Sequence, residues 1–198
     1  MKAIVFIAVA FCIGLSSSQA QDGCPTAKSA SRGFIVERGA SSKTEIFHSG
    51  NSEVRTVLRY NGNTLLEVTL FQGLFELDRL DRGKRAVYRP VSDLAKMFPP
   101  VPGKKLTAVF EEMDGDRKGN LRTYVLEVRK EQDTLSVGAC KYKVLRIERN
   151  RLDDKSKPVF MYTDYYAPDL KLILGKEYRE RDGRTELIKF DKIYQTPR

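Results

Sequence analysis

The sequence contains no tryptophan and a single histidine, and these two shortages narrow the chemistry that it can perform. The lone His48 cannot build a multi-histidine metal site, and no serine–histidine–aspartate arrangement has motif support. The neighbouring Ser49 lacks the glycine-flanked context of a nucleophile elbow. We therefore predict no catalytic residue, no metal site and no cofactor.

Paired carboxylates are the remaining route to hydrolysis. Asp153-Asp154 and Glu111-Glu112 are the candidate pairs, and a glycosidase-like enzyme needs two carboxylates facing one cleft. Both pairs lie in turn-like or strand-end contexts without a surrounding group of aromatic residues. A hydrolase acting on envelope polymers therefore stays only as an alternative.

Long apolar runs are missing after the first twenty residues. In residues 1–20, Lys2 precedes an apolar run from Ala3 to Leu15, and the small residues around Ser18-Gln19-Ala20 end the segment. This order is typical of a cleaved export signal. The apolar run is shorter than the about 20 residues needed to span a bilayer. We predict cleavage near Ala20 and a mature chain that does not span a membrane.

Cysteine is scarce, with three residues in the chain. Cys12 falls within the predicted signal, which leaves Cys24 and Cys140 for one possible pairing. Because exported proteins meet an oxidising environment, we predict a Cys24–Cys140 disulfide. Asp22 is unsuited to a lipid-attachment motif before Cys24, so the protein is predicted to be unanchored and periplasmic, with an extracellular location as the alternative.

The formal net charge of +9 allows several anionic partners. Export argues against nucleic acid, and we predict no nucleic-acid partner. The basic residues are interspersed with acidic ones, as in the stretch from Lys176 to Asp182. Such mixed charge is typical of a solvated surface.

Short strands separated by turn signals begin near residue 34. From Val54 to Tyr60 the residues of one strand face (Val54, Thr56, Leu58, Tyr60) alternate with those of the other face. Asn61-Gly62 follows and is a strong hairpin signal. Stretches 64–71 and 140–144 show the same period, and Arg181-Asp182-Gly183-Arg184 predicts another hairpin. We predict a mainly β fold: one strongly curved antiparallel sheet, half-barrel, clam or barrel-like, with at most one short helix.

Two segments depart from the strand pattern. Residues 91–98 follow Pro90 and precede Pro99, and they can form two helical turns. Residues 21–32 read as a loose N-terminal arm that a disulfide would hold. The predicted organisation is a signal peptide at 1–20, an arm at 21–32 and a single antiparallel β domain at 33–198, since no repeat or linker divides it.

A half-open sheet offers an apolar concave face to a ligand, whereas a sandwich or a closed sheet uses the same residues as core. If a hollow exists, alternation predicts seven lining residues and two tyrosines at its rim. These candidate ligand-binding residues are Leu66, Val68, Leu70, Leu126, Val128, Tyr142 and Val144, with Tyr165 and Tyr166 at the rim.

The C-terminal part carries a resemblance. Tyr166-Ala167-Pro168-Asp169-Leu170, then Leu172 to Tyr178 and Glu186-Leu187, is similar to a pattern in secreted proteobacterial proteins of an uncharacterised family. Their turn reads Tyr-x-Pro-(Asp/Glu)-Leu, and Gly138 to Val144 resembles a strand upstream of it. These proteins are distantly similar to lipoprotein-localisation carriers, which curl a sheet over helices around acyl chains. The resemblance implies a curved sheet in a bacterial periplasm and assigns no catalytic residue.

Together these observations predict a non-enzymatic exported envelope protein that binds an apolar or amphiphilic envelope component, such as a lipid, or a protein partner. A second interpretation is a purely structural or interaction protein that uses a sheet edge. The hydrolase of envelope polymers is the third.

Overall fold

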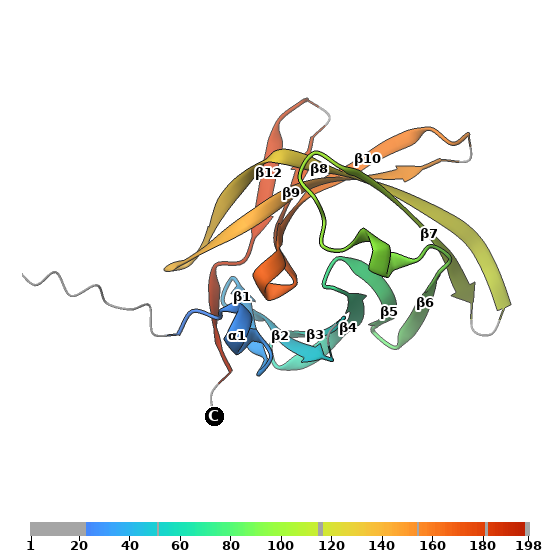
Figure 1. The fold of residues 1–198 in the computed structure, drawn as a ribbon. Coiled ribbons are helices and arrows are strands. Elements are labelled where there is room, and N and C mark those ends of the chain that lie inside the picture. Colours follow the sequence, from blue (N-terminus) through green and yellow to red (C-terminus); the bar gives the residue numbers. More distant parts are fainter. Residues whose placement is uncertain (1–22, 51, 115–116, 154, 181, 197–198) are drawn as a thin grey trace, which may run out of the picture.

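A computed structural model describes residues 23–50, 52–114, 117–153, 155–180 and 182–196 (Figure 1). The predicted signal peptide at 1–20 lies outside these residues, as do the first two residues of the arm. No helix within the described ranges has the length and apolar character needed to cross a bilayer.

The described chain forms one 13-stranded antiparallel sheet. The strands are β1 (Phe34–Arg38), β2 (Ser42–Ser49), β3 (Glu53–Tyr60), β4 (Asn63–Phe71), β5 (Phe75–Asp81), β6 (Lys84–Pro90), β7 (Lys105–Asp114), β8 (Arg117–Val137), β9 (Cys140–Leu152), β10 (Pro158–Ala167), β11 (Leu172–Arg179), β12 (Thr185–Lys189) and β13 (Lys192–Gln195). The mainly β, strongly curved antiparallel fold that the sequence predicts is confirmed.

Local turn chemistry explains the meander of consecutive strands. Asn61 and Gly62 connect β3 to β4 with φ values of 48° and 80°, the left-handed conformation that a two-residue hairpin requires. Gly183, with φ of 84°, lies in the turn between β11 and β12. Both predicted hairpins are confirmed.

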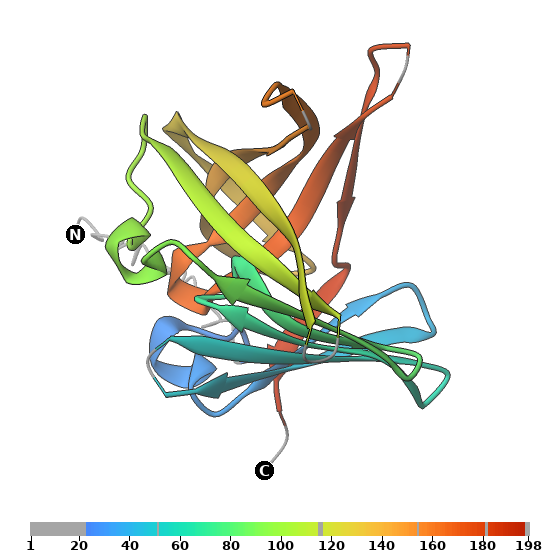
Figure 2. The ribbon, with the colours of Figure 1, turned by 90° about the vertical axis from the view of Figure 1, so that its right-hand side faces the viewer.

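The last two strands bring the ends of the sheet together. Strand β12 pairs with β11, whereas β13 pairs with β1, and these two strands are the ends of the strand order. Between them, the Phe190 N–H donates to Leu174 O on β11 (3.3 Å) and the Asp191 N–H donates to Glu37 O on β1 (2.8 Å). Figure 2 shows this red C-terminal segment running from the β11–β12 hairpin to the lower layer. The segment from β12 to β13 thereby joins the two ends of the curled sheet.

Short helical segments lie beside and between the layers of the sheet. The segment η1 (Leu94–Met97) is a 3-10 helix within the 91–98 stretch and is shorter than the two predicted turns. A second 3-10 helix, η2 (Pro168–Leu170), lies between the upper strands β8–β10 and the lower strands (Figure 1). Both bury a leucine, Leu94 and Leu170.

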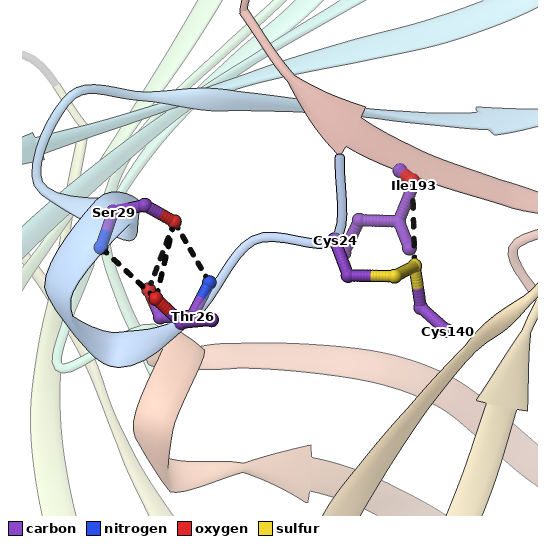
Figure 3. Close-up of a disulfide and its surroundings, with 5 residues drawn as sticks. All are labelled: Cys24, Thr26, Ser29, Cys140 and Ile193. Atoms are coloured by element: carbon purple, nitrogen blue, oxygen red, sulfur yellow. Dashed lines mark hydrogen bonds between the residues drawn. A yellow bond between two sulfur atoms is a disulfide. The ribbon is translucent and has the colours of Figure 1, made fainter. Parts of the chain in front are cut away.

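The N-terminal arm is more ordered than the sequence suggests. It contains α1 (Ala27–Ala30), whose N-cap Thr26 and Ser29 form a reciprocal capping box (Figure 3). This helix satisfies backbone donors that a loose arm would leave to water. The pattern of apolar residues in the sequence does not predict this helix, because its four residues are too few to show a helical period.

The predicted disulfide is confirmed. Cys24 and Cys140 are joined across 116 positions of the sequence, and their Cα atoms lie 5.7 Å apart (Figure 3). Cys140 is buried, and its Sγ lies 3.8 Å from the Ile193 carbonyl oxygen on β13. The bond therefore ties the arm to β9 next to the C-terminal strand.

Two apolar clusters form the interior, and strands β9–β11 contribute to both. Val144 belongs to the first cluster and its neighbour Leu145 to the second. Likewise Leu172 and Leu174 belong to the first and Ile173 packs against the second. Because successive strand residues point to opposite faces, both faces of this part of the sheet are covered.

Candidate functional site

The inner side of the curled sheet holds a cavity of about 280 Å³ that is partly open to solvent. Its lining residues come from the β4–β5 loop and from eight consecutive strands, β4 to β11, so distant strands of the meander face one another across it. The lining residues are Leu70, Leu74, Phe75, Glu76, Arg79, Tyr88, Phe110, Tyr124, Arg149, Met161, Tyr162, Ile173 and Lys176. The cavity is therefore apolar over part of its wall and charged over another part.

A buried ion pair forms one wall. Arg149 on β9 donates to Asp164 Oδ2 on β10 from both Nε (2.9 Å) and Nη2 (2.8 Å). The two side chains are 7% and 0% exposed. Burial lowers the pKa of Arg149, but the charge of Asp164 and further groups raise it more, so the net shift is upward and the guanidinium stays charged. Both hydrogen bonds reach Oδ2, and the buried Asp164 Oδ1 accepts none from the described residues.

Lys176 adds a second cation beside this pair. Its Nζ lies 3.8 Å from Asp164 Oδ1 and 3.9 Å from the centroid of the Tyr162 ring. The Asp164 carboxylate already accepts two hydrogen bonds from Arg149, so one carboxylate faces two cations. This wall of the cavity carries a net positive charge.

The opposite wall holds Glu76 and Arg79, both on β5. Arg79 Nη1 lies 3.4 Å from Glu76 Oε2, and Arg79 Nη2 lies 3.3 Å from Asp81 Oδ2. Burial raises the pKa of Glu76, and Arg79 only partly reverses this effect. The carboxyl group therefore gains a proton more readily than an exposed glutamate.

Tyrosines line the space between the charged walls. Burial is the main cause of the raised pKa values of Tyr88 and Tyr124, so both hydroxyls stay neutral. Tyr124 also contacts Phe110 edge to face, with ring centroids 6.0 Å apart, and Tyr162 lies beside Tyr178 at 5.6 Å. These residues provide an apolar surface with polar tips.

The β4–β5 loop contributes Leu74 to the wall of the cavity and is held by contacts with distant segments. Tyr166 donates its hydroxyl hydrogen to Gln72 O (2.7 Å), and Arg149 Nη2 donates to Leu74 O (3.0 Å). Between them, Gly73 adopts a φ of 67° and packs directly against the Lys171 backbone. Three successive residues of the loop are thus held by Tyr166 on β10, by the Lys171 backbone that follows η2, and by Arg149 on β9.

The nine residues predicted to line a hollow do not lie together in the structure. Leu70 lines the cavity, whereas Leu66 and Val68, also on β4, belong to neither described apolar cluster. Of the remaining six, three belong to the first cluster or pack against it, and three belong to the second. These residues are Tyr142, Val144 and Tyr165 in the first, and Leu126, Val128 and Tyr166 in the second.

The two rim tyrosines are buried in the structure. Tyr165 is 7% exposed and Tyr166 is 2% exposed. The hydroxyl of Tyr165 donates to Glu177 Oε2 at 3.1 Å, while that of Tyr166 holds the β4–β5 loop. Both positions follow from their neighbouring places on β10, which direct them to opposite faces.

The charged residues of the cavity were not singled out from the sequence. One signal for Arg149 was available, because it continues the apolar alternation of Leu145 and Ile147 and therefore faces the interior. Asp164 likewise stands between buried residues on β10. Glu76 and Lys176 carry no comparable signal, since charged residues at such positions usually face solvent.

Metal-dependent catalysis needs several ligating side chains in one place. No cluster of three or more histidine, cysteine, aspartate or glutamate side chains suited to a metal is found among the described residues. His48 lies 6.0 Å from the Phe34 ring centroid, and burial is the main cause of its lowered pKa. Of the predicted carboxylate pairs, Asp154 lies outside the described residues, and Glu112 is bound to Arg122.

No family model matches the sequence, and no curated protein matches it. The crystal structure of the hypothetical lipoprotein YmcC from Escherichia coli (K12) is similar over 79% of this chain and 86% of that chain, with 9% sequence identity and a TM-score of 0.47. Similarity at this level assigns neither a family nor a function to the chain.

Proposed function

We propose that this protein is a non-enzymatic binding protein of the bacterial cell envelope that holds an amphiphile in its interior cavity. The observation that carries the proposal is the composition of the cavity wall. Six of its lining residues are apolar: Leu70, Leu74, Phe75, Phe110, Met161 and Ile173. Arg79, Arg149 and Lys176 place cations at the same space.

The size of the cavity supports a small ligand or a single chain. Its volume of about 280 Å³ lies at the lower end of the range of about 300–1,000 Å³ for small-molecule sites. An amphiphile satisfies both kinds of wall, because its tail covers apolar side chains and its head meets the charged ones. A purely apolar ligand would displace water from the charged groups without offering them a polar contact in return.

The disulfide supports a location outside the cytoplasm. Cys24 and Cys140 are bonded in the structure, and such bonds persist in oxidising compartments. This agrees with the export signal expected at residues 1–20. The periplasm is the compartment that we propose, because the resemblance seen in the C-terminal sequence is to periplasmic proteins.

The test is binding by the full chain after export to the Escherichia coli periplasm. Native mass spectrometry would detect a co-purified amphiphile, and a fluorescent fatty-acid probe would measure binding in solution. Leu70→Trp fills the cavity, whereas Leu80→Trp is the matched control on an exposed position (40% exposed). We expect loss of binding in the first variant only. The absence of binding by the wild type, or equal binding by both variants, would contradict the proposal.

A protein partner at the sheet edge is the second candidate. Strand β12 pairs with β11 on one side and is an end of the strand order in the described sheet. Leu187 in this strand is 38% exposed. Such an edge can pair with a strand of another protein. A pull-down that succeeds with wild type and fails with Leu187→Pro would support this candidate.

The arrangement of acids favours binding over hydrolysis. Among the described residues that line the cavity, Glu76 is the acidic one, and Asp164 lies behind the lining with its carboxylate held by Arg149. A two-carboxylate hydrolase needs both acids to face the substrate.

A further inference from the structure

A second pocket lies where the two ends of the sheet approach each other. It has a volume of about 200 Å³, and it is called the seam pocket here because β1 contributes one wall and β11 and β12 the other. Its lining residues are Arg38, Ile173, Leu174, Gly175, Lys176, Tyr178, Ile188, Lys189 and Phe190. The chain crosses between the sheet ends at Phe190, so the pocket lies beside the junction of β12 and β13.

The seam pocket is cationic. Arg38, Lys176 and Lys189 line it, and the described lining residues include no acid. Arg38 and Lys189 are exposed, and Lys189 Nζ donates to Ser136 O at 2.7 Å. The nearby carboxylate of Asp191 accepts the Gly39 N–H at 2.6 Å, on the backbone next to Arg38. Arg38 and Lys189 therefore meet no carboxylate on the wall of the pocket, whereas Lys176 Nζ lies 3.8 Å from Asp164 Oδ1 on the cavity side.

The pocket also has an apolar part. Leu174 is fully buried, and Ile188 and Phe190 are half-buried at its wall. A free inorganic anion uses only the cations of such a site. An anion that carries a hydrocarbon chain uses both parts, because the chain removes apolar surface from water.

The seam pocket adjoins the interior cavity. Ile173 and Lys176 line both spaces and form the boundary between them. Lys176 already lies near Asp164 and over Tyr162 on the cavity side. A chain that passes this boundary leaves the seam pocket and meets the apolar wall formed by Leu70, Leu74 and Phe75.

We propose that the seam pocket is the head-group site of the ligand and that the ligand is a single-chain anionic amphiphile. Its carboxylate or phosphate head binds Arg38, Lys176 and Lys189, and its chain extends past Ile173 into the cavity. Opposite charges in a partly apolar site attract such a head more strongly than they do in bulk water. This inference rests on the proposed binding function and names the class of its ligand.

The test compares four probes that share a decyl chain or its decanoyl equivalent. They are decanoate, decyl phosphate, decyl maltoside and decyltrimethylammonium, each below its micellar concentration, with inorganic phosphate as the head alone. Calorimetry would measure their affinity for the full chain. We expect the two anionic amphiphiles to bind more tightly than the neutral one, and we expect the cation and free phosphate to bind most weakly. Added salt should weaken only the anionic probes.

Three charge variants locate the head-group site. Arg38→Gln and Lys176→Gln each remove a cation of the seam pocket, and Lys84→Gln removes the same charge from the exposed first residue of β6. We expect the first two to weaken decanoate binding about tenfold, which is the worth of one charge-assisted contact. Lys84→Gln should leave it unchanged. Arg38 is exposed, so its variant reports on binding without a large change in folding.

The outcomes separate this inference from the proposed function. Equal affinity for anionic and neutral probes, together with unchanged binding by Arg38→Gln and Lys176→Gln, would overturn the head-group site while leaving amphiphile binding intact. Binding of inorganic phosphate as tight as that of decyl phosphate would show an anion site without a chain and would also overturn the inference. Binding of none of the amphiphiles would overturn both.

Discussion

Replacing one glycine should separate the β4–β5 loop from the turn that supports it. Gly73 has a φ of 67°, and a Cβ atom placed there would lie 1.6 Å from the Lys171 carbonyl oxygen. The clashing atom is backbone, so no side-chain rotation removes the overlap. In Gly73→Ala the loop must therefore move away from the segment that follows Pro168.

The magnitude follows from the contacts that this movement breaks. A left-handed conformation costs a non-glycine residue about 1–2 kcal/mol. Loss of the hydrogen bond from Tyr166 to Gln72 O adds about 0.5–1.5 kcal/mol, and loss of the charged one from Arg149 to Leu74 O adds about 1.5–3 kcal/mol. We expect Gly73→Ala to lower the free energy of unfolding by about 3–6 kcal/mol.

Gly39→Ala is the matched control. Gly39 has a φ of 64°, but no atom lies within 4 Å of a Cβ placed there. This variant should lose only the conformational part, about 1–2 kcal/mol. Urea unfolding followed by circular dichroism measures both variants against the wild type. Equal losses in the two variants would refute the argument that the loop is fixed by close packing.

Three further measurements test other parts of the structure. Reducing the Cys24–Cys140 bond, which spans 116 positions, should lower the free energy of unfolding by about 2–5 kcal/mol. Oxidised and reduced wild type have the same sequence, so a comparison of their urea midpoints measures the effect of the bond. Identical midpoints would contradict this expectation. Burial raises the pKa of Tyr142 from 10.0 to about 12, and its buried hydroxyl has no hydrogen-bond partner among the described residues. Stability should therefore fall as pH rises from 10 through 12. Because burial also raises the pKa of Tyr194 to about 12, Tyr142→Phe should show a smaller fall than wild type, and it should be about 1 kcal/mol more stable at neutral pH. Burial also raises the pKa of Glu76 above 4.5, so wild type should lose stability as pH rises from 4.5 through that raised value. The melting temperature of Glu76→Gln should depend less on pH over this interval. The same pH dependence in wild type and variant would contradict this expectation.

Local signals in the sequence predict much of the sheet. Asn61-Gly62 predicts a hairpin because two residues are enough to specify the backbone conformation of the turn. The alternation from Val54 to Tyr60 predicts a strand, and it too is a property of a short stretch of sequence. The Cys24–Cys140 bond was predictable because removal of the expected signal leaves one pairing. These features depend on short stretches or on simple counting.

The candidate site depends on contacts between distant segments, and these had no such signal. Alternation tells which residues share a face, but it does not tell which face of a curled sheet encloses a cavity. Val144 and Leu126 both match a buried face, yet they belong to different apolar clusters. Glu76 and Lys176 line the same cavity because β5 and β11 face each other across the curl, and this follows only from the whole topology.

The pairing of β1 with β13 has a consequence for the order of folding. One edge of β1 pairs with the adjacent β2, but Phe34 on its other edge pairs with Gln195, so that edge finds its partner only among the last described residues. While the chain is being synthesised, the free edge of β1 stays unpaired until nearly every other strand has emerged. Such an edge is prone to pair with other chains. Loss of residues 192–195 would therefore leave an aggregation-prone protein, even though the rest of the meander could still form.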